Sequence, residues 1–293
     1  MAADRERGLT ARDHANLDVS LRNEADMAYR RRTRILLDYL DLHDGERVLD
    51  AGCGMGFYLA VMGSLRCLRL TGVDADADRL AWGRREQVPA DLLQADLSHL
   101  PFPDATFDKI LLSEVLEHLS DDAAGLRELS RVLKPGGILA ISVPHARYPF
   151  WWDPISRMRD WMRLEPIRHG PIATIWSNHE RLYEPATLAE RVRAAGFGVE
   201  KLEEATHYCV PFIHFIVYGI GKPLLEMDLL PRSLRDNADR FRGARNSGNP
   251  LNLINLGLAL FRAVDGLNEG PKIRRPSTYV NVLLKARARE RAS

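Results

Sequence analysis

The feature that most constrains the fold of this chain is a glycine-rich turn between two apolar segments. Residues 48–58 read Val-Leu-Asp-Ala-Gly-Cys-Gly-Met-Gly-Phe-Tyr, and a second apolar segment ends on Asp74. This order predicts a buried strand, a tight turn, a helix and a second strand that closes on a carboxylate. Glycine lets a ligand approach the backbone, and the acid can accept hydrogen bonds from ribose hydroxyls. The sequence therefore predicts a nucleoside-binding corner, with a purely structural turn as the alternative.

The glycine spacing indicates which nucleoside fits. Gly52, Gly54 and Gly56 follow the pattern G-x-G-x-G, whereas a dinucleotide site needs G-x-G-x-x-G. Phe57 stands where the third glycine of that pattern would be. Asp50 would also repel a pyrophosphate, because like charges disfavour each other. The turn therefore suits a ligand with a cationic amino or sulfonium group.

Five motifs carry a resemblance to a known family. They are residues 50–56 (DAGCGMG), 94–97 (QADL), 101–108 (PFPDATFD), 110–119 (ILLSEVLEHL) and 131–144 (RVLKPGGILAISVP). In this order they resemble the motifs of class I S-adenosylmethionine (SAM) dependent methyltransferases over about residues 30–205, and residues 114–119 and 131–137 also resemble the quinone-biosynthesis branch of the type 11 methyltransferases. The resemblance implies an α/β, Rossmann-like, seven-stranded and mostly parallel sheet with helices on both faces, plus a helical insertion before the last strand.

The composition narrows the class of protein. The chain has 293 residues, 45% of them apolar, which is ample for a core. A net charge of +1 argues against a nucleic-acid-binding protein. The three cysteines are scattered and show no pairing with histidines, so neither a metal site nor a disulfide framework is expected. The charged N-terminus shows no signal peptide, and we expect a cytoplasmic protein that could associate with a membrane.

Apolar patterning predicts the order of the elements. One helix is expected over residues 17–41, with the arginine run Arg30–Arg32 on its outside. Strands are expected at 46–51, 69–74, 91–95, 108–112, 137–143, 199–205 and 278–286. The predicted divisions are an N-terminal helical segment (1–41), the SAM-binding core (42–206, with a substrate cover at 144–184), an apolar helical insertion (207–276), and the last strand with its tail (277–293).

The resemblance implies a role for each residue of the cofactor site. Asp50 and the backbone of Gly52 and Gly54 would hold the amino-acid end of SAM, and Asp74 would accept hydrogen bonds from the ribose. Ala75, Asp96 and Leu97 would contact the adenine, and Ser113 would line the methionine part. Two structural alternatives stand beside these roles, because Asp96 could cap a turn and Asp74 could cap a helix that starts at Asp76.

Three histidines are candidates for a general base. His118 follows the fourth predicted strand, His145 follows the fifth, and His179 lies in a polar segment further on. Open α/β sheets place ligands at the carboxyl ends of their strands, and imidazole titrates near neutral pH. Each histidine could instead be structural.

Two segments outside the core bear on the acceptor. Residues 144–176 hold four of the five tryptophans (Trp151, Trp152, Trp161, Trp176) with interleaved arginines. Residues 207–276 contain an uncharged apolar run at 208–221 and a stretch at 232–249 with five arginines and two aspartates. An apolar segment beside a basic one is typical of peripheral membrane contact, here through 207–264, or of a lipid-sized pocket. The alternatives are ordinary core, an extra helical layer or a homodimer interface.

These features predict a SAM-dependent methyltransferase that modifies an oxygen or carbon of a small-molecule or lipid-like acceptor. A prenylated quinone or a natural product would fit. The cofactor would be S-adenosyl-L-methionine. Two other classes stay open: a SAM-binding partner subunit without activity, and an NAD-dependent oxidoreductase.

Overall fold

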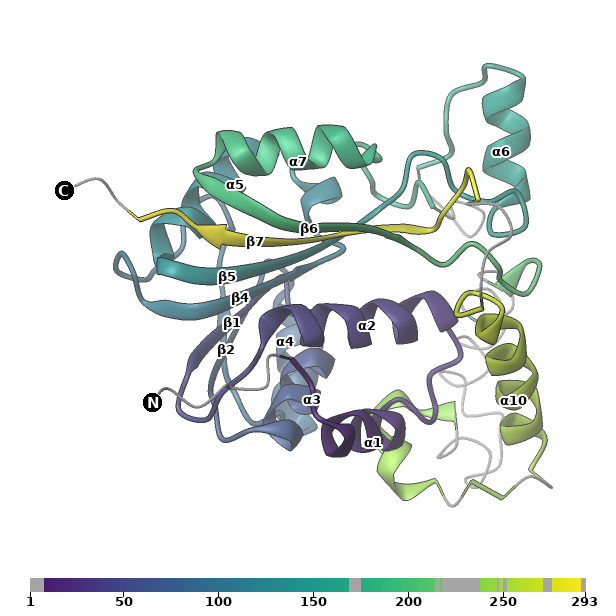
Figure 1. Cartoon of the computed structure of the whole chain (residues 1–293), viewed down its shortest axis with the longest axis horizontal. Helices are drawn as coiled ribbons and strands as arrows, with labels where there is room; N and C mark the ends of the chain where they lie inside the picture. The colour runs from purple at the N-terminus through teal and green to yellow at the C-terminus, as the bar shows by residue number, and fades with distance from the viewer. Residues whose placement is uncertain are drawn as a thin grey trace.

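A single seven-stranded sheet forms the centre of the molecule (Figure 1). The computed structural model describes residues 8–168, 175–213, 217, 238–246, 248–249, 252–270 and 276–290. The strand order is β3-β2-β1-β4-β5-β7-β6. The bounds are β1 Arg47–Ala51, β2 Arg69–Asp74, β3 Asp91–Gln94, β4 Phe107–Ser113, β5 Leu133–Pro144, β6 Phe197–Ala205 and β7 Asn281–Ala288.

All strands but β7 run parallel. β7 pairs antiparallel with both β5 and β6, so Pro144 and Ala205 both lie opposite Asn281 at one edge of the sheet. β1 lies between β2 and β4, so the strand order reverses at its carboxyl end. Such a switch point is where open α/β sheets bind ligands. The predicted fold class is confirmed, and the carboxyl edge is the place for a site.

Helices cover both faces of the sheet. The first set is α1 Ala11–Ser20, α2 Met27–Leu40, α3 Phe57–Leu65 and α4 Ala77–Arg85, and the second is α5 Asp122–Val132 and α7 Pro185–Ala194. One buried cluster joins α5 and α7 to strand residues such as Leu49 and Ile110, and another joins the first set to Val48 and Leu111. Neighbouring residues in a strand point to opposite faces, so strands that are apolar throughout need helices on both sides.

The prediction of one helix over residues 17–41 is wrong. α1 starts at residue 11, because Thr10 and Asp13 form a reciprocal capping box. The chain then breaks, and Asp26 caps α2 by accepting a hydrogen bond from the Tyr29 N–H at 3.0 Å.

The arginine run is also not on the outside of the helix. The side chains of Arg30, Arg31 and Arg32 are only 13%, 15% and 11% exposed. They are enclosed because tertiary partners reach them: Asp265 pairs with Arg31 at 3.0 Å and Glu114 with Arg32 at 3.5 Å.

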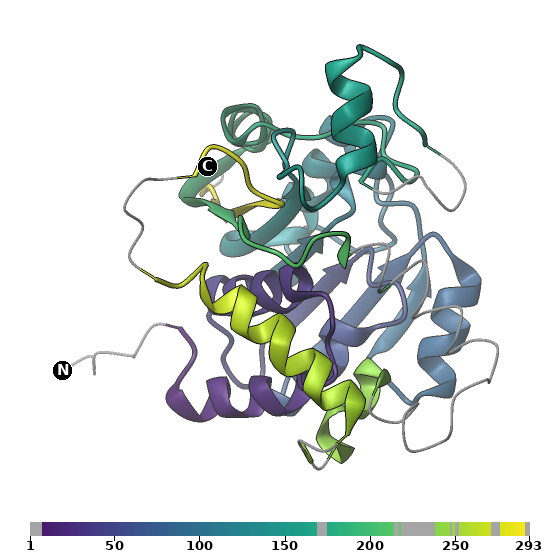
Figure 2. The ribbon, with the colours of Figure 1, turned by 90° about the vertical axis from the view of Figure 1, so that its right-hand side faces the viewer.

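The described parts of two segments, residues 145–184 and 206–280, project from the carboxyl edge (Figures 1 and 2). We call these described parts the cover layer. Its described elements include α6 Pro154–Trp161, η3 Arg240–Arg245 and α10 Leu253–Gly266. A third buried cluster, containing Trp152, Ile175 and Ile213, holds the two segments together. Much of the apolar run at 208–221 and of the basic stretch at 232–249 lies outside the described residues.

The four tryptophans of the cover layer divide into two kinds. Trp152 is buried and Trp176 packs partly buried against the same cluster, so these two are ordinary core. Trp151 and Trp161 are 56% and 68% exposed.

Across the part of the chain that the structure describes, no helix has both the length and the apolar character to span a bilayer.

Candidate functional site at the carboxyl edge

The glycine loop between β1 and α3 turns sharply. Gly52, Gly54 and Gly56 all have positive φ values of 80°, 53° and 82°, which side chains rarely adopt. The Val73 carbonyl accepts hydrogen bonds from the Gly52 and Cys53 N–H groups at 2.7 and 2.9 Å, which fixes the loop to β2. A Cβ on Gly52 would lie 2.3 Å from the Val115 side chain, whereas one on Gly54 would meet nothing closer than 4.0 Å. The loop is therefore packed on one side and open at Gly54.

Asp50 is buried without a hydrogen-bond partner for its Oδ2 atom in the described structure. Burial, and then the charge of Asp74, raise the pKa of Asp50 to about 8. A buried carboxylate that lacks a partner is costly, since desolvation disfavours its charge. A cationic group at this position would remove that cost.

Asp74 ends β2 beside the same loop. One of its oxygens accepts a hydrogen bond from the Gly54 N–H at 2.7 Å, and the other accepts one from the Asp76 N–H at 2.9 Å. Asp76 itself caps α4, so the direct helix cap is Asp76 rather than Asp74. The influence of Asp74 on the pKa of Asp50 shows that both carboxylates share this corner.

The residues expected around the adenine follow the second and third strands. Ala75 is exposed, and its carbonyl accepts a hydrogen bond from the Gln94 amide at 2.9 Å. Leu97 is buried. One Asp96 oxygen accepts hydrogen bonds from the Ser98 N–H and hydroxyl at 2.8 Å, and these bonds lower its pKa. Asp96 thus caps a turn, while it remains exposed beside Leu97.

A polar network joins the ends of β4, β5 and β7. Ser113 Oγ lies 3.0 Å from Ser142 Oγ, and Ser142 Oγ donates to Glu114 Oε1 at 2.9 Å. The same Glu114 oxygen accepts a hydrogen bond from Asn281 at 3.2 Å, and its other oxygen lies 3.5 Å from Arg32. Glu114 has a φ of 55°, an unusual backbone for a residue other than glycine. Such strain persists only where surrounding contacts fix it, and it clusters at functional sites.

Sequence reasoning missed Glu114 and Arg32. The signal for Glu114 was present, because it directly follows Ser113 at the end of a strand. Arg32 gave no such signal, since a run of arginines on a helix usually faces water.

An aromatic wall stands next to the glycine loop. Tyr29 of α2 lies 5.8 Å from Phe57 and 5.4 Å from Tyr58, between ring centroids. Tyr58 Oη reaches Ser113 Oγ at 3.0 Å. The guanidinium of Arg240 lies 4.6 Å from the Tyr29 ring, so the cover layer closes this wall.

His145 does not suit a general base. It is fully buried, its Nδ1 accepts a hydrogen bond from the Arg147 N–H at 2.8 Å, and its Nε2 donates to Glu204 at 2.9 Å. Burial lowers the pKa of His145, although Glu204 opposes the effect. Both ring nitrogens are used within the protein, so we correct this expectation.

His118 and His179 come together, with ring centroids 4.6 Å apart. His118 is exposed, and its Nδ1 donates to the Asn178 carbonyl at 2.9 Å, so its Nε2 carries the lone pair in the neutral ring. His179 Nε2 lies 3.7 Å from Glu117 Oε1. Glu117 is completely buried, and burial followed by the charge of Glu114 raises its pKa well above the ordinary value.

The same three residues bear on the expectation that the chain has no metal site. Glu117, His118 and His179 each offer one ligand atom, and these atoms lie within 4.8 Å of one another. The fold therefore assembles a carboxylate and two imidazoles that could hold a divalent ion, which the spacing of these residues in the sequence did not indicate.

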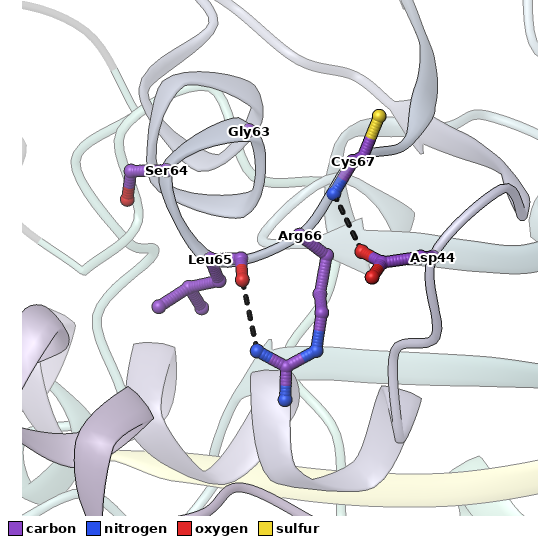
Figure 3. Close-up of a pocket in the computed structure, with 6 residues that line it drawn as sticks. All are labelled: Asp44, Gly63, Ser64, Leu65, Arg66 and Cys67. Carbon is purple, nitrogen blue, oxygen red and sulfur yellow. Dashed lines mark hydrogen bonds between the residues drawn. The ribbon is translucent and has the colours of Figure 1, made fainter.

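A surface pocket lies at the opposite edge of the sheet (Figure 3). It is lined by Asp44 and residues 63–67, where Asp44 accepts a hydrogen bond from the Cys67 N–H at 2.7 Å and Arg66 donates to the Leu65 carbonyl at 2.8 Å. These residues precede β1 and β2, so the pocket is remote from the candidate site.

Comparison with known proteins identifies the central part of the chain. Residues 49–141, from β1 through most of β5, match the model of the methyltransferase domain family. This region belongs to the class I SAM-dependent methyltransferases. The five motifs that resemble this family lie within or beside the matched residues.

The relatives of this methyltransferase domain differ in what they act on. A demethylmenaquinone methyltransferase from Corynebacterium kroppenstedtii is 40% identical over 116 residues, covering 40% of this chain and 48% of the relative. A 27-O-demethylrifamycin SV methyltransferase from Amycolatopsis mediterranei is 28% identical over 191 residues, covering 62% and 64%. The chain spans about half the length of other curated relatives that it matches.

A solved structure with this fold is the [4+2]-cyclase SpnF. It has a TM-score of 0.55 at 21% identity and covers 88% of this chain and 81% of its own. That protein is named a cyclase, so the likeness shows the fold, and the chemistry must be argued from the site.

Proposed function

We propose that this chain binds SAM at the carboxyl edge and transfers a methyl group to an oxygen or carbon of a small-molecule or lipid-like acceptor. The observation that carries the proposal is the buried Asp50 oxygen without a partner, set beside an open glycine and a second carboxylate. A ligand that is cationic at one end and carries a ribose matches these groups. The family of the domain agrees with this ligand.

Each part of the ligand has a group to meet. Asp50 and the Gly52–Gly54 backbone would hold the amino-acid end, Asp74 the ribose hydroxyls, and Ala75, Asp96 and Leu97 the adenine. When bound, SAM supplies a methyl group on a positively charged sulfur, which is open to direct displacement. The protein then has to align the acceptor and exclude water, rather than provide a covalent helper.

His118 is our candidate for the base. Its Nδ1 bond to Asn178 leaves the lone pair on the exposed Nε2, where it can take a proton from an acceptor hydroxyl. His179 packs against this ring and joins it to the buried Glu117, so His179 is a positioning residue. The polar network of Ser113 and Glu114 lies at the end of β4, shortly before His118 in the chain, and suits a polar acceptor head.

Two features support the acceptor class. The domain's relatives are named for a menaquinone precursor and for a rifamycin, both organic small molecules. Around the site, Tyr29, Phe57 and Tyr58 offer an apolar wall. A molecule with an apolar body and a polar nucleophile agrees with the relatives' names and with this apolar wall.

Calorimetric titration tests the proposal. The wild-type chain should bind SAM and S-adenosylhomocysteine and should not bind NAD. Asp50→Asn should weaken SAM binding at least tenfold, because the charge that would pair with the ligand's ammonium is lost. Incubation with methyl-labelled SAM and a lipid extract should then label an acceptor.

The matched control is Asp91→Asn, which alters an exposed carboxylate at the opposite edge of the sheet and should leave SAM binding unchanged. Binding of NAD in preference to SAM would contradict the proposal. Tight SAM binding without any labelled acceptor would favour the non-catalytic partner role instead.

A further inference from the structure

Three side chains that can bind a metal ion meet just after strand β4. Glu117 and His118 belong to the short 3₁₀ helix η1, Leu116–His118, and His179 comes from the cover layer. One possible ligand atom from each of the three lies within 4.8 Å of the other two. The tertiary structure therefore brings one carboxylate and two imidazoles together from segments that are far apart in the chain.

Hydrogen bonds to backbone carbonyls hold these two segments in place. The Glu180 N–H donates to the Glu117 carbonyl at 2.9 Å. The Arg181 guanidinium donates to the Leu119 carbonyl and, at 3.0 Å, to the Ser120 carbonyl. Side chains on a backbone that is already fixed lose little freedom when they bind a ligand, so this arrangement favours binding.

Glu117 is the residue that indicates a ligand. It is completely buried, and neither of its carboxylate oxygens has a hydrogen-bond partner in the described structure. Its Oε1 atom lies 3.7 Å from His179 Nε2, which is too far for a hydrogen bond. Buried carboxylates in proteins are normally hydrogen-bonded, paired or bound to a metal, because burial without a partner is costly. A divalent ion would supply the partner that Glu117 lacks.

His118 already has the second contact that is typical of a metal-binding histidine. Its Nδ1 donates to the Asn178 carbonyl at 2.9 Å, so the lone pair lies on Nε2. In metal sites the nitrogen that does not bind the ion usually donates to a carbonyl or a carboxylate, which orients the ring and raises its basicity. The ring is also exposed, so an ion can reach it from solvent.

We propose that Glu117, His118 and His179 bind a first-row divalent ion such as Zn²⁺. Imidazole and carboxylate ligands both suit Zn²⁺, and two histidines with one glutamate make a known zinc ligand set that leaves a fourth position open. Mg²⁺ suits the site less well, because it prefers oxygen ligands.

The bound ion would also affect the reaction. A lone pair that binds an ion cannot accept a proton, so an ion on His118 would remove the base and inhibit methyl transfer. This consequence rests on the proposed function, whereas the binding of the ion does not. The site would make methyl transfer sensitive to zinc.

Calorimetric titration of the untagged full chain with ZnCl₂ tests the site. The protein is first stripped with a chelator, and no SAM is present. The wild type should bind Zn²⁺, and Glu117→Gln and His118→Gln should each weaken this binding by about tenfold or more. MgCl₂ should bind the wild type more weakly than ZnCl₂ by about tenfold or more. Zn²⁺ should raise the Tm of the wild type but not that of His118→Gln, because the ion binds only the folded site.

The matched control is His43→Gln. His43 also lies 3.7 Å from a carboxylate, that of Asp41, but the described residues offer this pair no third ligand. The control should bind Zn²⁺ like the wild type. Absence of Zn²⁺ binding by the wild type overturns the proposal, as does equal binding by Glu117→Gln and His118→Gln. Glu117 and His179 would then form only an internal ion pair.

A second measurement separates this inference from the proposed function. Saturating Zn²⁺ should lower the rate at which methyl-labelled SAM labels an acceptor by about a hundredfold or more, as loss of a general base would, and a chelator should restore it. Zn²⁺ binding at the site without this inhibition would support the metal site and contradict the base role of His118. Absence of labelling with and without Zn²⁺ would count against methyl transfer, while the titration would still decide the metal site.

Discussion

At the scale of single residues, the site contains carboxyl groups that the fold buries with unpaired oxygens. Asp50 has no partner for one buried oxygen, and Glu117 has no hydrogen bond to either carboxylate oxygen in the described structure. Asp13, in contrast, is buried but bonded to Arg66, so its pKa is lowered. Asp13 therefore stabilises the fold, whereas Asp50 and Glu117 are free to pair with a ligand.

This difference gives Asp50 a measurable pH dependence. Its pKa is raised to about 8 in the folded chain, whereas in the unfolded chain it should be about 4. The folded state therefore holds the proton more tightly, and the stability that this provides is lost as pH rises from about 4 through about 8.

The variant Asp50→Asn should not lose this stability as the pH rises. At pH 8 its free energy of unfolding should exceed that of the wild type by roughly 5 kcal/mol, because the two pKa values differ by about four and each unit is worth about 1.4 kcal/mol. The Tm should rise by about 10–20 °C. At pH 4 the two proteins should unfold alike. Thermal unfolding across this range, without SAM, checks the prediction, and a difference that stays constant with pH would contradict it.

His118 is expected to act on the rate and not on cofactor binding. His118→Gln should lower kcat for labelling the acceptor by about 10²–10⁴-fold, because a general base contributes this much. The affinity for SAM should stay within about twofold. The control is His14→Gln, on the exposed side of α1, which should leave both quantities unchanged. If His118→Gln transferred methyl groups at the wild-type rate, the base would have to be sought elsewhere.

At the scale of elements, the glycine loop is a packing requirement as well as a ligand contact. Gly52 needs a positive φ, and it also abuts Val115 in the segment after β4. The loop after β1 and the segment after β4 therefore hold each other in place, and both flank the site.

Gly52→Ala should destabilise the chain by about 2–4 kcal/mol, since backbone strain and overpacking add. It should also abolish SAM binding. Gly45→Ala is the matched control, because Gly45 has a φ of 84° but nothing within 4 Å of its added Cβ. It should cost about 1 kcal/mol and leave SAM binding intact. Adding Val115→Ala to Gly52→Ala should restore part of the stability. Chemical unfolding and calorimetry measure these effects, and equal losses in both glycine variants would show that the contact with Val115 is irrelevant.

The strands and the glycine loop follow from the sequence because their signals are local. Each strand lies within a few residues of its prediction, since a strand buried on both faces must be continuously apolar. The glycine-containing part of the last motif, Lys134–Gly137, lies inside β5, where the pairing with β4 is irregular: the register shifts between Phe107 and Lys109. The burial of the arginines of α2 could not be predicted, since their partners Glu114 and Asp265 are more than eighty residues away.

At the scale of the whole molecule, two distant segments form one layer over the carboxyl edge. The buried cluster of Trp152, Ile175 and Ile213 joins the segment after β5 to the segment after β6. The antiparallel β7 makes this arrangement possible, because it lies between β5 and β6 and both therefore end at the same edge. A long segment inserted after β5 or after β6 therefore lies next to the site.

The sequence by itself determined the sheet, the SAM-type glycine loop and the acids Asp50 and Asp74, because these depend on local spacing and on a buried strand's need for apolar residues. Only the tertiary structure decided which histidines meet, that His145 is enclosed, and that Arg32 reaches Glu114. Those outcomes depend on contacts between residues far apart in the chain, and no local pattern encodes which side of a helix finds such partners.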